Sequence, residues 1–578
     1  NRSLAGWALV LALGGLVAGC DKPSIASRSE VPIGNTAAWF EDATEESGLD
    51  FTHDPGFIGS YFFPQIMGSG AALFDYDGDG RLDIYLIQNG GPDSPSTNRL
   101  FHQETDGTFR DTSDGSGLDV AGFGMGAACG DVNNDGRVDL LLTEYGRIRL
   151  FLNDGGGQFR DVTVQARLEN PLWGTSAALV DYNRDGWLDI VVANYVKYDS
   201  GRSCFNPLGR IDYCDPKTFA GNVAKLYRNN GGSMATPGGV VFSDETLASG
   251  LARASAPGLG VVCVDFDGDH WPDIFISNDG RPNHLWMNQR DGTFKEEAAL
   301  RGVAYNAMGA AEANMGIALG DVDGDDLFDV YVTHLLSETN TLWCGEAAPA
   351  RGVFRDQTVR SGLAESGWRA TGFGAVLADF THRGALDLAV VNGGVTQGPR
   401  ATATDPRLAP FWADYAQRDQ LFANDGAGNF LDVSEQNAAF CATAAVSRAL
   451  ACGDLDNDGD LDLLTTAVGG RARLFRNIAP KAGHWLGVRA VDPALGGRDA
   501  CGAEVAVTAG GRHRTRWANP GYSYLCSNDP RAHFGLGEAA SIESIRVVWA
   551  DGIEEDFPGG PVDRYVTLRK GEGTSGPK

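Results

Sequence analysis

The sequence DYDGDGRLD, residues 75–83, carries aspartate at its positions 1, 3, 5 and 9 and lies between the apolar runs AALF and IYLI. Side chains at positions 1, 3 and 5 of a tight loop can converge, position 7 can offer its carbonyl, and position 9 can close the shell. Oxygen ligands at this spacing suit calcium, and Gly80 permits the positive backbone torsion that the turn needs. An EF-hand would need Glu where this chain has Leu86, and helices where it has strand-like runs. We therefore predict a calcium loop within a β-hairpin.

This nine-residue motif recurs six more times, beginning at Asp131, Asp181, Asp265, Asp321, Asp379 and Asp454. All seven copies have Asp at positions 1 and 9, and the fixed spacing argues against the alternative of seven solvated acidic turns. His270 and Asp326 replace the glycine of position 6, and both residue types tolerate left-handed torsions. Arg383 stands at position 5 of the sixth copy, so we expect about six calcium ions and one metal-free hairpin.

The predicted metal ligands follow from this pattern, with position 7 contributing only its backbone carbonyl. They are Asp75, Asp77, Asp79, Arg81, Asp83, Asp131, Asn133, Asp135, Arg137, Asp139, Asp181, Asn183, Asp185, Trp187, Asp189, Asp265, Asp267, Asp269, Trp271, Asp273, Asp321, Asp323, Asp325, Leu327, Asp329, Asp454, Asp456, Asp458, Asp460 and Asp462.

A Leu-aromatic pair follows each loop, and in six of the seven cases a further short run with Phe comes after it. Each unit thus reads as four short strands, which is the signature of propeller blades. The seventh unit lacks its Phe strand, but an orphan copy, WFEDATEESGL, begins at Trp39. We expect this N-terminal strand to complete the last blade, which closes the ring and removes its exposed edges.

Composition limits the partners of this chain of 578 residues with a net charge of -29. From Pro480 onward there are 12 basic and 12 acidic residues, so the whole acidic excess precedes that point. Phosphate binding needs a basic stripe, so nucleic acid is excluded as a partner.

The N-terminal region predicts that the protein is located outside the cytoplasm. Residues 1–19 resemble a bacterial lipoprotein signal peptide that ends in the lipobox LVAGC, with Cys20 as the lipidated residue and 20–36 as a tether. An ordinary signal peptide and an uncleaved anchor are the alternatives. Lipidation would place the protein on the bacterial cell envelope, in the periplasm or at the surface, with a membrane contact through its anchor.

Outside the cytoplasm disulfides are possible, and nine cysteines remain after Cys20. Cys204 and Cys214 lie close together in a long insertion, and Cys501 and Cys526 lie in the C-terminal region, so we predict these two disulfides. The pairing of Cys344 and Cys441 stays open.

At this point the chain resembles a known family. Its loops look like FG-GAP or VCBS repeats of integrin α-type propellers, and HWLGV, GAEV, HFGLG and IRVVWADG after residue 483 resemble the ASPIC and UnbV domain. The combination is similar to the cartilage acidic protein family. It implies that the propeller is integrin α-like. From the residues themselves, the strand count predicts seven blades over 37–479, and the alternating strands with Gly turns predict a small β-sandwich over 480–578, so we expect an all-β chain. Within the predicted sandwich, His533 reads first as a structural residue rather than a catalytic one, and its tryptophans read as core or interface residues.

Two long insertions, 195–223 and 393–420, fall between second and third strands, which places them on the face opposite the calcium loops. The loop 53–68 adds Phe57, Tyr61, Phe62 and Phe63 to that face. Aromatic loops over a rigid ring suit recognition, although these rings could equally cap the central channel.

Two functions are consistent with these features. The first is a non-catalytic, calcium-stabilised binding or adhesion module that recognises protein or glycan on the face opposite the calcium loops. The second is an enzyme that cleaves polysaccharides, as a lyase or a hydrolase. The chain has only nine histidines, and neither H-E-x-x-H nor C-x-x-C-H occurs in it, so we favour binding.

Overall fold

The computed structural model describes residues 37–232, 239–401 and 403–575. The predicted signal peptide, tether and Cys20 lie outside these residues. The regular secondary structure of the described part is mainly β-strand, with only short helices such as α1 (Pro64–Met67), α2 (Ala298–Arg301) and α3 (Ala438–Cys441). No helix among the described residues has the length and apolar character needed to cross a bilayer.

Within the described residues, seven sheets form the repeat region, and each contains four antiparallel strands from the predicted pattern. Blade 1 contains β2 (Ala71–Phe74), β3 (Asp83–Leu86), β4 (Arg99–Gln103) and β5 (Phe109–Asp111). Blade 2 contains β6 (Gly124–Gly130), β7 (Asp139–Glu144), β8 (Arg147–Gly155) and β9 (Gln158–Asp161). Blade 3 contains β10 (Gly174–Val180), β11 (Asp189–Asn194), β14 (Lys225–Gly232) and β15 (Val240–Asp244).

The remaining sheets follow the same order. Blade 4 contains β16 (Gly258–Val264), β17 (Asp273–Asn278), β18 (His284–Asn288) and β19 (Phe294–Glu296). Blade 5 contains β20 (Ile317–Gly320), β21 (Asp329–Val332), β22 (Thr341–Gly345) and β23 (Phe354–Asp356). Blade 6 contains β24 (Gly372–Ala378), β25 (Asp387–Asn392), β26 (Gln420–Asn424) and β27 (Phe430–Asp432). Blade 7 contains β28 (Ser447–Gly453), β29 (Asp462–Ala467), β30 (Arg473–Asn477) and β1 (Phe40–Asp42).

The first strand of the chain completes the last sheet. β1 pairs antiparallel with β30, and the register places Phe40 opposite Asn477 and Asp42 opposite Phe475. The prediction from the orphan Trp39 segment is therefore confirmed. The outer edge of β30 is covered, so blade 7 has the same four-strand order as its neighbours.

The repeated Leu-aromatic pair has a structural reason. Successive side chains of a strand point to opposite faces, so one pair serves two interfaces between blades. In β4, Leu100 packs into the core shared with blade 2, whereas Phe101 packs into the core shared with blade 7. The pair therefore recurs because each blade contributes to the cores on both of its sides.

The C-terminal region forms two packed sheets, as the sequence predicted. One sheet contains β32 (Arg498–Asp499), β31 (His484–Asp492), β36 (Ala532–Gly537) and β39 (Arg564–Arg569). The other contains β34 (Arg512–Ala518), β33 (Ala503–Ala509), β37 (Ile542–Val548), β38 (Glu554–Gly560) and β40 (Thr574–Ser575). A shared core of buried residues from both sheets, including Leu486, Val505 and Phe534, holds them together.

Residues 519–529 of this region leave the sandwich and enter the centre of the ring, and we call them the plug. The plug's strand β35 (Cys526–Ser527) pairs in parallel with β2 of blade 1. Tyr524 and Leu525 are buried at 0% and 1% exposure among side chains from several blades. Consequently the repeat region and the sandwich belong to one continuous unit, Ile33–Lys578.

Hydrogen bonds fix the plug to the inner strands of different blades. Ser523 exchanges two backbone bonds with Ile317 of blade 5, at 2.7 and 3.1 Å, and its hydroxyl donates to the Leu450 carbonyl of blade 7. The N–H of Leu525 donates to the hydroxyl of Ser176 in blade 3. Gly126 of blade 2 permits this approach, because a Cβ there would lie 2.9 Å from the Cα of Leu525.

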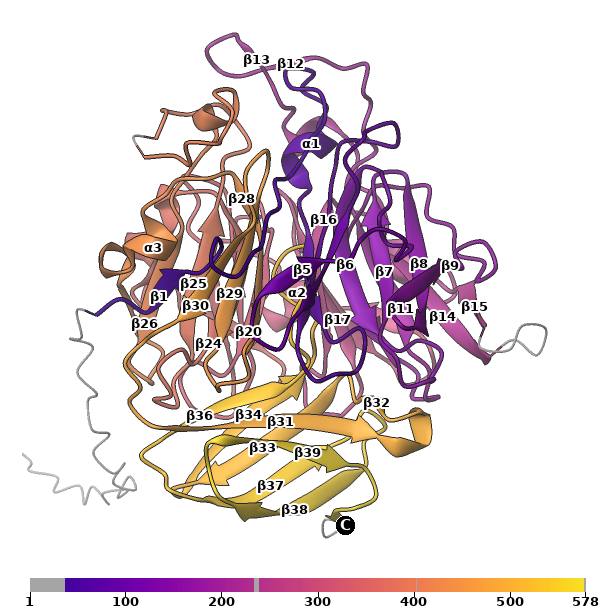
Figure 1. The fold of residues 1–578 in the computed structure, drawn as a ribbon, viewed down its shortest axis with the longest axis vertical. Coiled ribbons are helices and arrows are strands. Elements are labelled where there is room, and N and C mark those ends of the chain that lie inside the picture. Colours follow the sequence, from indigo (N-terminus) through magenta and orange to yellow (C-terminus); the bar gives the residue numbers. More distant parts are fainter. Residues whose placement is uncertain (1–36, 233–238, 402, 576–578) are drawn as a thin grey trace, which may run out of the picture. The chain divides into compact units, whose positions relative to one another are not determined.

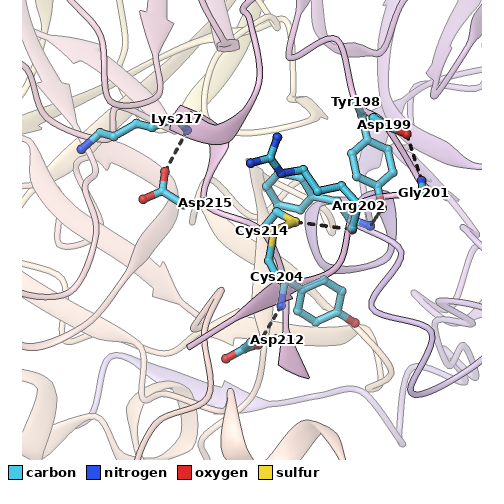
Figure 2. Close-up of a disulfide and its surroundings, with 11 residues drawn as sticks. Tyr198, Asp199, Gly201, Arg202, Cys204, Asp212, Cys214, Asp215 and Lys217 are labelled. Atoms are coloured by element: carbon cyan, nitrogen blue, oxygen red, sulfur yellow. Dashed lines mark hydrogen bonds between the residues drawn. A yellow bond between two sulfur atoms is a disulfide. The ribbon is translucent and has the colours of Figure 1, made fainter. Parts of the chain in front are cut away.

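One of the two predicted disulfides is present, and one is wrong. Cys204 and Cys214 are bonded, with a Cα–Cα distance of 5.1 Å, at the base of the hairpin formed by β12 (Cys204–Phe205) and β13 (Ile211–Asp212) (Figure 2). Cys501 and Cys526 are both free thiols. Cys526 belongs to the plug and pairs with Ala71 inside the ring, whereas Cys501 packs against blades 2 and 3, so proximity in sequence was misleading.

Candidate metal centres and binding face

The repeated loops adopt one backbone geometry, organised by the aspartate at position 1. Its carboxylate accepts the N–H groups of positions 5 and 6; in the second loop Asp131 accepts from Asp135 at 3.1 Å and from Gly136 at 2.7 Å. The same pair of bonds forms at Asp75, Asp181, Asp265, Asp321 and Asp454. This arrangement bends the loop tightly around the carboxylate.

The aspartate at position 9 connects the loop to the blade. Asp139 accepts the N–H of Val132 at 3.0 Å with one oxygen and that of Asn153, on the third strand, at 2.8 Å with the other. The same role falls to Asp83, Asp189, Asp273, Asp329 and Asp462. This aspartate is therefore a structural cross-link as well as a predicted ligand, which the spacing alone did not reveal.

Position 5 accepts from position 7. Backbone N–H groups of Arg81, Arg137, Trp187, Trp271, Leu327 and Asp460 donate to the carboxylates of Asp79, Asp135, Asp185, Asp269, Asp325 and Asp458. The side chains at position 7 differ widely, as expected where only the backbone is needed.

The structure brings the predicted carboxylates together. Ligand oxygens of positions 1, 3 and 5 lie within 4.8 Å of one another in four loops: Asp75, Asp77 and Asp79; Asp265, Asp267 and Asp269; Asp321, Asp323 and Asp325; Asp454, Asp456 and Asp458. The second and third loops have the amides of Asn133 and Asn183 at position 3, whose oxygens accept the position-5 N–H at 3.0 Å. Three or more oxygen donors around one point suit a hard cation such as calcium.

Burial and neighbouring carboxylates raise the pKa of the position-9 aspartates. Burial raises the pKa of Asp83 to about 8, backbone N–H bonds from Gln103 and Tyr76 oppose the shift, and the charges of Asp77 and Asp75 add to it. Burial likewise raises the pKa of Asp139 and Asp462 well above the usual range. A divalent cation would favour the ionised form of every one of these groups.

The sixth loop carries its own cation. The guanidinium of Arg383 contacts Asp387 at 2.8 Å and donates to the hydroxyl of Thr381 at 2.6 Å. Asp379 still accepts the N–H groups of Arg383 and Gly384, so the loop keeps the common backbone geometry. Arg383 thus places a positive charge beside Asp387, where the other loops carry an aspartate at position 5, and the metal-free hairpin stays a prediction.

The C-terminal sandwich lies at the end of the ring that carries the predicted metal loops (Figure 1). Tyr565 donates to the carboxylate of Asp454, and Arg531 donates to the Asp454 carbonyl at 2.9 Å. Arg498 donates to the side-chain oxygen of Asn134 in the second loop at 2.8 Å. His533 donates to the carbonyl of Gly459 at 2.8 Å and stacks on Trp485, so it is a structural contact rather than an open catalytic group.

The two long insertions meet at the other end of the ring. The hydroxyl of Tyr415 donates to Asp212 at 2.8 Å, and the N–H of Gln397 donates to the other oxygen of Asp212 at 2.8 Å. Around this junction, Tyr61 packs against Tyr213 and Phe411, with ring centroids 5.4 and 5.6 Å apart. The insertions therefore form one structured surface rather than two independent loops.

Most of the aromatic side chains predicted for recognition close the channel instead. Phe63 is 2% exposed and packs edge-on against Trp173, while Phe62 is half-buried among Phe123, Tyr145 and Tyr198. Only Phe57 remains open to solvent, at 81% exposure. The packing of Phe62 and Phe63 thus favours capping for these two residues, while Phe57 stays exposed.

Other apolar side chains on this face lie outside the buried aromatic cluster and are exposed to solvent. We define the tip surface as Phe57, Ile58, Phe205, Leu208 and Ile211, all of which are exposed. The last three belong to the disulfide-linked β12–β13 hairpin, which Figure 1 shows at the end of the ring away from the C-terminal sandwich. Sequence reasoning passed over these three residues, although three apolar residues around the turn NPLG could have been noticed.

Comparison with known proteins agrees with this architecture. An FG-GAP-like repeat model matches residues 75–142, 131–192, 265–332 and 410–465, and an ASPIC and UnbV model matches residues 495–575. The chain is an FG-GAP repeat protein with an ASPIC and UnbV domain. It is homologous to cartilage acidic protein 1, with 28% identity to the Xenopus tropicalis protein over 61% of this chain and 52% of that one. The mouse protein is 27% identical over 54% of this chain and 45% of its own length.

The chain thus spans about half the length of the curated relatives it matches. Among solved structures, rhamnogalacturonan lyase PL11 of Bacillus licheniformis is 13% identical, with a TM-score of 0.36, over 71% of this chain and 72% of that chain.

Proposed function

We propose that this FG-GAP repeat protein is a calcium-stabilised, non-catalytic binding module that works outside the cytoplasm and recognises a protein or a glycan. The observation that carries the proposal is the difference between the two ends of the ring. The metal-loop end is covered by the C-terminal sandwich, and the opposite end carries both insertions and the tip surface. Exposed apolar and aromatic side chains on a rigid support are what recognition surfaces use.

Calcium would contribute stability to this support rather than contact the partner. The donor oxygens of positions 1, 3 and 5 lie within 4.8 Å of one another in four of the loops, and the C-terminal sandwich contacts the second and seventh loops. A metal that neutralises the loops would therefore hold the ring and the sandwich in register while the opposite face remains free.

The alternative is an enzyme that cleaves polysaccharides. Such an enzyme needs an acid and a base that are open to substrate. Near the insertion face, Tyr195 donates to Asp279 at 2.5 Å, but their exposures are 0% and 7%. Because these two side chains are buried and hydrogen-bonded to each other, they are poorly placed for catalysis. This favours a binding module over an enzyme.

We further propose that the protein is held on the bacterial cell envelope by a lipid at Cys20. This residue lies outside the described residues, and the proposal rests on the LVAGC sequence. A tether of residues 20–36 would leave the tip surface free to reach a partner.

The binding proposal can be tested with glycan and surface-protein arrays, run with and without calcium. Combining Phe205→Ser with Leu208→Ser should abolish capture and leave the calcium-dependent melt unchanged, because these side chains are 64% and 78% exposed and add little to the core. Deleting residues 399–416 should also abolish capture, but it removes the buried Trp412 and Tyr415 and should lower the melting temperature as well. Val164→Ser with Leu247→Ser is the matched control, since these side chains are 85% and 83% exposed on other loops. Capture that survives both insertion variants would place the site elsewhere, and depolymerisation of an acidic polysaccharide would favour the enzyme.

A further inference from the structure

The first metal loop differs from the other six in the residue that faces it from the third strand. In each blade, one residue of the third strand lies directly opposite the position-9 aspartate. In blade 1, Ile84 pairs with Phe101, so the preceding residue Asp83 lies opposite the following residue His102. In chain order these residues are His102, Leu152, Arg228, Met287, Cys344, Ala423 and Arg476. Only blade 1 has an imidazole at this position.

His102 points its Nδ1 atom at two of the loop's carboxylates. Nδ1 lies 3.3 Å from an oxygen of Asp83 and 3.5 Å from an oxygen of Asp77. The three donor atoms lie within 4.8 Å of one another. The Nδ1 atom is buried and has no hydrogen-bond partner among the described residues, so the contacts with Asp83 and Asp77 lack hydrogen-bond geometry.

The donors are held in place by the blade. The ring of His102 packs edge-on against Tyr76, with centroids 5.9 Å apart, and only 12% of its side chain is exposed. Asp83 is fixed by backbone N–H bonds from Tyr76 at 3.1 Å and from Gln103 at 2.9 Å. An imidazole and two carboxylates are therefore preorganised around one point.

The spacing and the donor types suit a smaller and softer ion than calcium. A tetrahedral zinc site with bonds of about 2.0–2.1 Å has ligand–ligand distances of about 3.4 Å. The measured separations from Nδ1 of 3.3 and 3.5 Å match this value. Calcium takes oxygen ligands, whereas imidazole nitrogen is a common ligand of zinc and other transition metals.

We propose that the first loop is a zinc-type transition-metal site, built from His102 Nδ1, Asp77 and Asp83, and that it differs in metal preference from the other loops. Asp75 and Asp79 complete the oxygen donors on the same loop. One of the seven blades would then bind its metal selectively in the presence of excess calcium.

The test measures zinc retained in calcium. The chain is loaded with one or more equivalents of Zn²⁺ in millimolar Ca²⁺, passed through gel filtration in the same calcium buffer, and assayed for zinc by mass spectrometry. We expect one zinc per chain in the unmodified protein. His102→Leu should lose it, with an apparent zinc affinity lower by about 100-fold or more, since removing even a residue that only supports a ligand costs 10- to 100-fold.

Two controls make the outcome decisive. Blade 2 carries Leu152 at the position equivalent to His102. The His102→Leu variant should therefore fold with an unchanged calcium-dependent melt. His270→Asn removes a histidine whose nearest loop carboxylate contact, to Asp265, is 3.9 Å, and it should keep its zinc. Co²⁺ absorption bands that disappear only in His102→Leu would identify the imidazole as the ligand. The proposal is overturned if the unmodified chain retains no zinc, or if His102→Leu retains as much.

Discussion

The phenol of Tyr565, on strand β39 of the C-terminal sandwich, donates a hydrogen bond to the carboxylate of Asp454, the first residue of the seventh metal loop. Arg531 contacts the same loop through the carbonyl of Asp454 and the side chain of Asn457. The sandwich therefore shares contacts with the predicted metal sites. Loss of metal from this loop should disturb the sandwich as well as the ring.

Chelation should lower the melting temperature of the whole protein. Clustered carboxylates repel one another when the metal is removed, and a ligand that binds only the folded state stabilises it by mass action. Calorimetry with and without excess chelator measures the effect, and we expect the ring and the sandwich to shift together. An unchanged melt in chelator would contradict calcium as a folding ligand.

Replacing Arg383 should change the number of bound ions. Arg383→Asp restores the carboxylate that six of the seven loops carry at position 5 and removes the guanidinium that pairs with Asp387. We expect metal analysis to return one more ion than in the unmodified protein. Arg383→Ala serves as the control, because it removes the cation without adding a ligand; a gain in both variants would mean that the carboxylate is not needed.

Truncating the plug at its centre should destabilise the protein strongly. Leu525 is 1% exposed, so Leu525→Ala should cost about 2–5 kcal/mol of unfolding free energy through lost burial and a cavity. Leu247→Ala, at a residue 83% exposed, should change stability by less than about 0.5 kcal/mol. Urea denaturation measures both. If the two variants were equally stable, the plug would not be part of the core.

Asp279 should make stability fall as pH rises. Burial raises the pKa of Asp279 from 3.8 to about 7, opposed by the hydrogen bond from Tyr195. Between these values the folded state holds a proton that the unfolded state has released, so stability decreases from about pH 4 to about pH 7. Asp279→Asn keeps an acceptor for Tyr195 and should be more stable than the unmodified protein above pH 7, by up to about 4 kcal/mol.

Melting curves in saturating calcium, recorded from pH 4 to pH 8, test this directly. Below about pH 4, Asp279 is protonated in both the folded and the unfolded state. The unfolding free energies of the two proteins should therefore converge. A constant difference across the whole range would indicate a packing effect without any titration of Asp279.

Cys20→Ser should release the protein from the membrane fraction or stall its processing. Stable membrane anchoring usually requires more than one acyl chain, and bacterial lipid modification depends on the cysteine thiol. Fractionation and mass measurement of the mature chain check the prediction. A Ser variant that stays membrane-bound with an unchanged mature mass would identify the apolar stretch as an uncleaved anchor.

Local repeats made much of the fold predictable. The loops, the Leu-aromatic pairs and the orphan strand at Trp39 each report short-range geometry, and a fixed period multiplies the signal. The plug gave no such signal, because NPGYSYLCSND reads as a surface loop rich in Gly, Pro and Ser residues. Its burial follows from contacts with residues hundreds of positions away, which no local pattern encodes. One example is the hydrogen bond from the backbone N–H of Cys129 to the hydroxyl of Ser527.

The same limit explains the mistaken Cys501–Cys526 pair and the reassigned aromatic cluster. Sequence showed that Cys501 and Cys526 share a domain, but not that one of them enters the ring. It also placed Phe62 and Phe63 on the correct face without showing that neighbouring loops would bury them. Which face a residue occupies was predictable, whereas its exposure depended on tertiary packing.

The plug has a consequence for the order in which the chain can mature. The ribosome releases the inner strands of the first blades long before residues 519–529 exist, and these strands then lack the segment that covers them. Closure of the ring also requires strand β1, which is synthesised early, to pair with strand β30, which is synthesised late. Contacts of such long sequence separation are slow to form. Final folding must therefore follow synthesis at least as far as residue 529, and until then the half-made ring exposes apolar strands that chaperones would have to shield.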